Sequence, residues 1–353
     1  MARKKQALVK SKTSLAKQTA ALKRARKEVL ARGAKLRRPH GLSRRKVLVM
    51  TASILLAIIV AFTATVGFLI YKSHSDSALV YRVSRIVPFP VARVNGDFVA
   101  YADYLFEVRY RKNIYSNPSG PASGSQEPVD FSKPESQQLL NDIQLSSLER
   151  AKIKAIIKQI AKDNNVTVSA QELDQAVDEL VQSQGGEKKF LDAIERFYGW
   201  NMNDFRQEYQ IQLLQQKLQL AVLPVLSTEQ KTQAEAILAR ARGGEDFAAL
   251  AREFSQDPGS KDQGGDLDFI AADTPFVPEF KEAALKLEPG QVSDVVASQF
   301  GFHIIKAFEK NSAGEVKVSH VLIQYAQDMD TVVSEELAKA KVSDYIKLPQ
   351  PQQ

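Results

Sequence analysis

The sequence contains no cysteine and only four histidines among its 353 residues. Without cysteine the chain can form no disulfide, no thiolate nucleophile and no Cys-ligated zinc site, and with so few histidines we expect no bound metal. The motifs GxxxxGK[ST], HExxH and GxSxG are also missing. Nothing therefore supports nucleotide binding, zinc-protease chemistry or serine-hydrolase chemistry, and no cofactor is expected.

Acidic side chains are almost missing from the first part of the chain. Residues 1–72 contain 18 Lys and Arg but one acid, Glu28, whereas the remaining 281 residues contain 30 basic and 40 acidic side chains. The stretch Ser14–Leu36 has a helix-forming composition but interleaves no aromatic residues on which bases could stack. The pattern favours an orientation signal that attracts anionic lipid over a nucleic-acid-binding arm, so no nucleic acid partner is expected.

Charge is absent from residues 47–71, a run of 25 residues between Arg44-Arg45-Lys46 and Lys72. A helix of this length measures about 37 Å, enough to cross a hydrocarbon core of about 30 Å. The excess of basic residues before it places residues 1–46 in the cytoplasm and the rest of the chain outside. A cleaved signal peptide would have an apolar region of about 7–15 residues and a small-x-small site. The pattern therefore predicts a retained single-pass anchor in the cell membrane.

After a polar linker at residues 72–85, helical periodicity dominates the sequence from Glu135 to Leu223. Asn95-Gly96 separates two short β-like runs, and a Pro-, Gly- and Ser-rich loop spans residues 116–134. Ser169 and Glu172 have the spacing of a capping box, which predicts a helix start. Pro224 is expected to end the last helix. The sequence thus predicts a mostly helical domain over residues 86–226.

Three stretches of this domain resemble the N-terminal chaperone domain of the SurA family, which PpiD-like and PrsA-like foldases share. They are VARVNGDFVAYADYLF from Val91, AKDNNVTVSAQELDQAV from Ala161 and YGWNMNDFRQEYQIQLL from Tyr198. In that family such a domain cradles unfolded segments of client proteins. The resemblance therefore implies client polypeptides as partners, and a helical spacer without client binding is the alternative.

Residues 228–310 contain a denser set of motifs, which resemble a parvulin-type peptidyl-prolyl isomerase domain. The motifs are Gly244-x-x-Phe247-x-x-Leu250-Ala251, Phe254-Ser255-x-Asp257, Gly264-Gly265-Asp266-Leu267, Pro278-x-Phe280, Leu287-x-x-Gly290 and Gly301-Phe302-His303-Ile304-Ile305-Lys306. Pro289-Gly290 predicts a turn before a strand at residues 292–296. Alternation along residues 302–306 predicts that His303 and Ile305 share one face of a strand. The resemblance implies a small antiparallel sheet with helices.

One element of the parvulin pattern is displaced along the chain. In the family, a strand that reads approximately His-Ile-Leu-Ile precedes the first helix and supplies a second central histidine. No histidine lies just upstream of Thr228, but residues 316–325 match this strand and contain His320. Either a truncated second repeat begins there or the domain is circularly permuted. Because residues 309–314 have the length of a hairpin connection, we expect permutation, with His320 beside His303.

The resemblance also implies site residues. His303 and His320 match the paired histidines, and Asp257 matches a position that is Cys in some parvulins and Asp in many bacterial ones. The implied walls of a proline-binding pocket are Phe276, Phe280, Leu267 and Leu322. Each residue also has a structural alternative: core packing for the apolar side chains, internal hydrogen bonds for the histidines and a turn for Asp257. Residues 324–330 contain no Lys or Arg, so selectivity for phosphorylated Ser or Thr is not expected.

The sequence as a whole predicts an α+β protein. Its expected parts are a basic cytoplasmic tail (1–46), a transmembrane helix (47–71), a linker (72–85), a SurA-like helical chaperone domain (86–226), a parvulin domain (227–326) and a C-terminal segment (327–353) with a helix at 330–348. The implied function is that of a bacterial, extracytoplasmic, membrane-anchored foldase that isomerises X-Pro bonds in translocated or secreted clients. Two alternatives remain, a non-catalytic holdase chaperone with a degenerate parvulin domain and a membrane tether without client binding.

Overall fold

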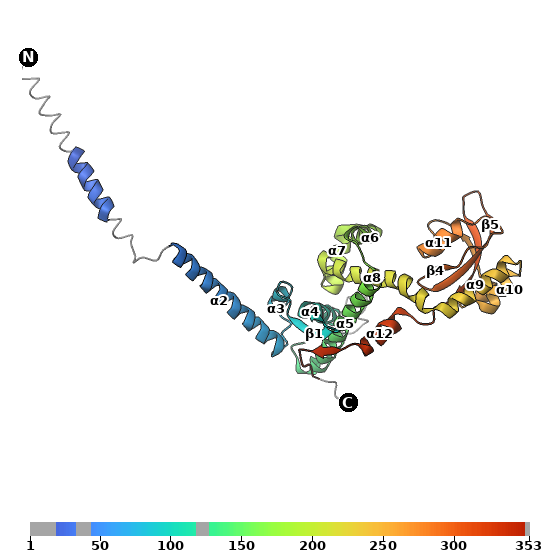
Figure 1. Cartoon of the computed structure of the whole chain (residues 1–353), viewed down its shortest axis with the longest axis horizontal. Coiled ribbons are helices and arrows are strands. Elements are labelled where there is room, and N and C mark those ends of the chain that lie inside the picture. Colours follow the sequence, from blue (N-terminus) through green and yellow to red (C-terminus); the bar gives the residue numbers. More distant parts are fainter. Residues whose placement is uncertain (1–18, 33–43, 118–126, 350–353) are drawn as a thin grey trace, which may run out of the picture. The chain divides into compact units, whose positions relative to one another are not determined.

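A computed structural model of the chain describes residues 19–32, 44–117 and 127–349 (Figure 1). The chain divides into two compact units, residues 1–68 and 69–353. In the first unit residues 19–32 form a helix, and helix α2 (Arg44–Tyr71) begins there and ends in the second unit. Among the described helices, α2 alone is long and apolar enough to cross a membrane, with a mean hydropathy of 2.6 in an 18-residue window within Arg45–Tyr71. Parts of the predicted basic tail (residues 1–18 and 33–43), part of the predicted loop (118–126) and the last residues of the C-terminal segment (350–353) lie outside the described residues.

The second unit contains a helical lobe and a sheet lobe. The helical lobe starts with α3 (Ala78–Ser84), the hairpin β1 (Pro90–Val94) and β2 (Asp97–Ala100), α4 (Tyr101–Ser116), η1 (Pro134–Ser136), α5 (Gln137–Asp163), α6 (Ala170–Ser183), α7 (Glu187–Tyr198) and α8 (Met202–Leu226). Helix α4 packs on α5. The predicted capping box is confirmed, because the Ser169 hydroxyl accepts from the Glu172 N–H and the Glu172 carboxylate accepts from the Ser169 N–H.

Two local predictions in this lobe are wrong. Residues 72–85 do not form only a linker, because α3 lies within them, capped by Ser77, with Val80 completely buried. Pro224 does not end α8, which continues to Leu226. Proline removes only one backbone donor from the last turn of this 25-residue helix, and the preceding Val222 and Leu223 are buried.

The C-terminal segment completes the helical lobe. Helix α12 (Met329–Lys339) contacts α5 and α8, and β7 (Val342–Asp344) pairs antiparallel with β1, which gives a sheet in the order β2-β1-β7. The buried side chain of Lys152 on α5 lies 3.5 Å from the Asp344 carboxylate of β7. The helix predicted at residues 330–348 therefore ends earlier than expected, because the following residues join the hairpin as a third strand.

The sheet lobe lies between these two parts of the helical lobe in the chain. It consists of α9 (Thr228–Arg242), α10 (Phe247–Phe254), η2 (Lys261–Gln263), β3 (Asp266–Ile270), α11 (Pro278–Leu285), β4 (Val296–Ser298), β5 (Gly301–Lys310) and β6 (Val316–Ile323). Its four antiparallel strands have the order β3-β6-β5-β4. The strand predicted at residues 292–296 is shifted: Val292 makes an isolated bridge to Lys306, and β4 begins at Val296.

Alternation along the two central strands separates two hydrophobic clusters. Phe302 and Ile304 of β5 pack with α9 and α10, whereas Ile305 of β5 packs with the α11 side chains Phe280 and Ala284. Strand β6 pairs with β5 from Ile323, opposite Phe302, to Val316, opposite Lys310. Strand β6, which is the last strand of the sheet lobe in the sequence, therefore lies at the centre of the sheet. Its pairing with β5 is consistent with a permuted arrangement.

Candidate active site

The two predicted histidines meet on the face of the sheet that α11 covers. In the β5–β6 ladder His303 is paired with Leu322, and His320 is paired with Ile305, which places both imidazoles on one face. Their Nδ1 atoms lie 3.2 Å apart, and the rings are stacked with an interplanar angle of 18°. Both side chains are almost completely buried. Residues from separate motifs are therefore brought into direct contact by the hairpin.

A continuous chain of hydrogen bonds passes through the histidine pair. Ser298 Oγ lies 2.7 Å from His303 Nε2 at one end. At the other end His320 Nε2 lies 2.9 Å from Asp257 Oδ2, and that oxygen also accepts a 2.5 Å hydrogen bond from the Ser260 hydroxyl. Every ring nitrogen of the pair therefore has a partner.

The chain of contacts assigns the proton positions. The Asp257 carboxylate can only accept, so His320 carries its proton on Nε2 and donates it to Asp257. A neutral His320 then accepts at Nδ1, so His303 donates from Nδ1 and accepts the Ser298 hydroxyl proton at Nε2. The Phe300 N–H donates to the same Ser298 oxygen at 3.1 Å, which leaves the hydroxyl proton for His303. One direction of donation thus runs from Ser298 to Asp257 with both rings neutral.

Burial keeps this network uncharged at the histidines. Desolvation, reinforced by the neighbouring His320, lowers the pKa of His303 to about 3. Burial also lowers the pKa of His320, although the Asp257 carboxylate acts in the opposite direction. For Asp257 burial alone would raise the pKa, but hydrogen bonds from Ser260 and His320 outweigh it and lower the pKa of this carboxyl. The site is therefore two neutral imidazoles anchored to one carboxylate.

Aromatic rings cover the histidines. Phe280, which is 1% exposed, presents its ring edge-on to His303 and His320 at centroid distances of 5.0 and 5.4 Å. Phe276 lies 5.3 Å from Phe280 and is only half-buried. Leu267 packs in the same cluster, and Leu322 lies on the histidine face of β6. The structure thus brings the predicted residues together, with apolar side chains beside the imidazoles.

Asp257 both contacts His320 and stabilises a turn. Its Oδ1 atom accepts from the Gly259 N–H at 3.1 Å, while Oδ2 faces His320 and Ser260. The structural alternative for this residue is therefore also present, and the two contacts use different oxygens. The turn holds the carboxylate in the position from which it orients the His320 ring.

Sequence reasoning missed Ser298 and Ser260, the hydroxyl partners at the two ends of the network. Ser260 is three residues after Asp257 in a turn, where Asp and Ser side chains commonly bond to each other. Ser298 lies in β4 opposite Gly301, and both hydroxyl positions are nearly fully buried. A buried hydroxyl needs a partner, but the sequence alone does not indicate which serines are buried.

Comparisons with known proteins agree with these two lobes. A family model described as a SurA-like N-terminal domain matches residues 42–219, and one described as a PPIC-type PPIASE domain matches residues 224–311. Foldase protein PrsA of Caldanaerobacter subterraneus is 31% identical over 229 residues, covering 62% of this chain and 72% of that protein. Foldase protein PrsA 4 of Bacillus cereus is 48% identical over 94 residues, covering 27% of this chain and 33% of that relative.

A crystal structure of peptidylprolyl isomerase PrsA from Bacillus cereus is also similar, with 22% identity, 64% of this chain and 85% of that chain covered, and a TM-score of 0.22. The chain spans about a third of the length of the Bacillus cereus relative above, but most of the Caldanaerobacter protein. The match to the SurA-like model covers half of the chain, and the isomerase-domain match follows it directly. The chain therefore belongs to the SurA/PrsA family of foldases, with a SurA-like N-terminal domain joined to a PPIC-type, or parvulin, peptidyl-prolyl isomerase domain.

Proposed function

We propose that this protein is a membrane-anchored, extracytoplasmic foldase that catalyses cis/trans isomerisation of X-Pro bonds in client polypeptides. The observation that carries the proposal is the neutral His303–His320 pair, hydrogen-bonded to Asp257 beneath the ring of Phe280. The family relation supports the same activity, since the domain matches the PPIC-type model.

The chemistry requires no covalent intermediate. Rotation about an X-Pro bond has a barrier of about 20 kcal/mol and takes tens of seconds or longer without a catalyst. An isomerase accelerates it by binding the twisted amide more tightly than either planar form. Phe276, Phe280, Leu267 and Leu322 supply an apolar environment for the proline ring. The buried imidazoles provide fixed dipoles beside it, and no proton has to leave the network during rotation.

The arrangement of the strands supports a circularly permuted isomerase domain at residues 227–326. The histidine-bearing β6, which comes last in the chain, lies between β3 and β5 in the sheet. After it the chain returns to α12 and β7 of the helical lobe. A truncated second repeat would leave β6 without a place in the first sheet, so permutation accounts for the pairing better.

The proposed membrane topology has residues 1–46 in the cytoplasm and both lobes outside. It is supported by the apolar helix α2, with a mean hydropathy of 2.6 in an 18-residue window within Arg45–Tyr71, and by the many basic residues that precede it. Client polypeptides would then meet the lobes as they emerge from the membrane. A protease added outside intact cells should digest the lobes, and their complete protection would contradict this topology.

A proline-peptide isomerisation assay with the full chain in detergent tests the activity. We expect His303→Ala to lower kcat/KM at least about tenfold, because it removes the ring that links Ser298 to His320. The matched control is His74→Asn, which removes a histidine outside the sheet lobe and keeps a residue that tolerates the φ of 46° found there. Absence of activity in the unsubstituted chain would reject the enzyme and leave a holdase chaperone.

A further inference from the structure

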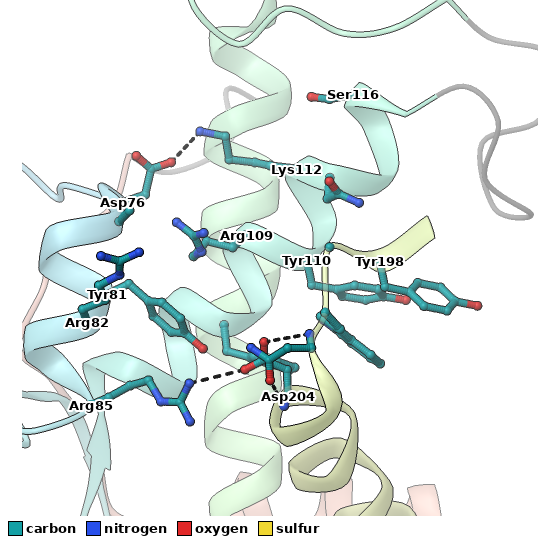
Figure 2. A pocket seen from close by; sticks show the side chains of 16 residues that line it. Asp76, Tyr81, Arg82, Arg85, Arg109, Tyr110, Lys112, Ser116, Tyr198 and Asp204 are labelled. Carbon is teal, nitrogen blue, oxygen red and sulfur yellow. Dashed lines mark hydrogen bonds and ion pairs between the residues drawn. The ribbon is translucent and has the colours of Figure 1, made fainter. Parts of the chain in front are cut away.

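A large polar-aromatic pocket lies in the helical lobe, where no part of the isomerase site reaches (Figure 2). Its volume is about 540 Å³, and it opens between α3, α4 and the residues that join α7 to α8. Basic side chains line one part, and Tyr110, Tyr198 and Trp200 line another. Neither the predicted functions of the helical lobe nor the isomerase chemistry uses this feature.

The basic part contains more positive charge than its own acids neutralise. Lys112 pairs with Asp76 at 2.5 Å, and Arg85 pairs with Asp204 at 3.5 Å. Within the part of the chain that the structure describes, no ion pair includes Arg82 or Arg109. Arg109 lies over the Tyr81 ring at 5.0 Å, and Figure 2 shows both arginines beside Tyr81, below the Asp76–Lys112 pair. Two guanidinium groups are thus available for an anion.

Helix α3, which contributes Arg82 to the pocket, also exposes apolar side chains next to this arginine. Leu79 and Ile86 are 55% and 82% exposed, whereas Val80 on the opposite side of α3 is completely buried. The helical turn continues beyond α3, because the Ile86 N–H donates to the Val83 carbonyl. Leu79, Arg82 and Ile86 have the spacing i, i+3, i+7, which places them on one face of this helical segment. Exposed aliphatic residues around a basic residue on one face are typical of segments that lie in a membrane interface.

The pocket follows the apolar helix α2 directly in the chain. Tyr71, the last residue of α2, donates from its hydroxyl to the Pro90 carbonyl at 2.9 Å. The Tyr101 hydroxyl donates to the Ser75 carbonyl at 3.3 Å. The chain between the end of α2 and the pocket residue Asp76 is therefore tied to the lobe. If α2 spans a membrane, α3 cannot lie far from the membrane surface.

We propose that this pocket and the exposed face of α3 bind the phosphate headgroups of an anionic phospholipid membrane. Arg82 and Arg109 bind the phosphate, and Leu79 and Ile86 enter the boundary between headgroups and acyl chains. The chain after residue 72 has 40 acidic against 30 basic residues, so its overall charge is negative and does not attract an anionic membrane. Attraction to such a membrane must therefore come from a local group of cations, such as Arg82 and Arg109. The inference rests on the membrane topology proposed above, and it is independent of isomerase activity.

The single tryptophan of the chain provides the test, because Trp200 lines the pocket. The full chain is reconstituted into phosphatidylglycerol–phosphatidylcholine vesicles that contain a phospholipid with a nitroxide on its headgroup. We expect quenching of Trp200 fluorescence, and we expect the double variant Arg82→Glu/Arg109→Glu to lose about half of it or more. Leu79→Ser/Ile86→Ser should act in the same direction.

The matched control is Lys189→Glu/Lys231→Glu, which changes the net charge equally at two exposed sites outside the pocket and should keep the quenching. Equal quenching in both charge-reversal variants would overturn the proposal. So would quenching relieved by an acidic soluble peptide, which would assign the pocket to client segments. Vesicle flotation separates the failures: a chain that floats without quenching contradicts only the headgroup site, whereas a chain that does not float contradicts the topology as well. Peptide isomerisation in the same samples reports the catalytic site independently.

Discussion

The two lobes of the second unit bury polar groups in opposite ways. In the sheet lobe, His303 and His320 are buried as neutral rings in a series of hydrogen bonds that ends at the Asp257 carboxylate. In the helical lobe, the buried Lys154 on α5 bonds to Glu107 on α4 and to Glu208 on α8, so full charges hold three helices together. Buried ion pairs are stable only when each charge keeps its partner. Buried neutral rings depend instead on not being protonated.

The lobes also differ in how the chain builds them. The sheet lobe is one continuous segment from α9 to β6, whereas the helical lobe takes α12 and β7 from the C-terminal segment. The Ala326 N–H donates to the Ser227 hydroxyl at 3.1 Å, so the chain enters and leaves the sheet lobe at one place. Because the sheet lobe is continuous and is joined to the helical lobe at one place, its site geometry should persist when the helical lobe is destabilised. Substitutions in the helical lobe should therefore change stability without changing isomerase activity.

The largest expected effect is on the charged network. Lys154→Met should lower the free energy of unfolding by about 3–5 kcal/mol, because Glu107 would remain buried without its partner. The control Lys158→Met changes an exposed lysine one turn away on α5 and should cost less than about 0.5 kcal/mol. Denaturant unfolding followed by far-UV circular dichroism measures both. Equal costs for the two variants would show that the charges do not hold the helices together.

A smaller effect is expected where β3 approaches β6 in the sheet lobe. A Cβ at Gly265 would lie 2.2 Å from the His320 carbonyl oxygen, and φ there is +80°. Gly265→Ala should therefore destabilise the lobe by about 2–4 kcal/mol and lower kcat/KM through displacement of His320.

Gly290→Ala is the matched control, because φ is +88° there but nothing lies within 4 Å of the added carbon. It should cost only about 1 kcal/mol and leave kcat/KM unchanged. If both glycine variants behave alike, backbone strain alone explains the effect, and close approach to the His320 strand is not important for catalysis.

The neutral network predicts a specific pH dependence. Because the pKa of His303 is lowered to about 3 from 6.5, the unfolded chain binds a proton between these pH values and the folded chain does not. The free energy of unfolding should therefore be highest above pH 6.5 and fall by about 1.4 kcal/mol per pH unit as the pH decreases toward 3. In His303→Asn this slope should be smaller by about 1.4 kcal/mol per pH unit, because the unfolded chain then binds one proton fewer. An unchanged slope would contradict a buried neutral His303.

Much of this organisation was predictable from the sequence because it depends on local patterns. The alternation around His303, the capping box at Ser169 and the Asn95-Gly96 turn each specify backbone geometry over a few residues. The contact between His320 and His303 was expected because residues 316–325 resemble the histidine-bearing strand of the family and a hairpin-length connection joins them to β5. These features needed no knowledge of distant contacts.

The remaining features depend on contacts between distant residues. β7 becomes a strand only because β1 offers an unpaired edge, and the Ser227 hydroxyl, which precedes α9, accepts from the distant Ala326 N–H and makes no cap bond to that helix. Ser298 is only five residues from His303 in the β4–β5 hairpin, but the sequence does not indicate that its hydroxyl is buried against the imidazole. The pocket beside α3 was missed for the same reason, since its cations come from helices whose contact the sequence does not specify.

The smallest expected effect concerns the strand that closes the helical lobe. Asp344→Ala removes the contact from β7 to Lys152, but Lys152 keeps Glu149 at 2.6 Å. Because the lysine remains paired, we expect a loss of at most about 1 kcal/mol in denaturant unfolding, and no change in isomerase activity. Asp273→Ala, at an exposed position in the sheet lobe, is the control and should leave stability unchanged. A loss of several kcal/mol for Asp344→Ala would mean that the charged network of the helical lobe extends to its C-terminal strand, and the contrast between the lobes would then include the way the chain closes on itself.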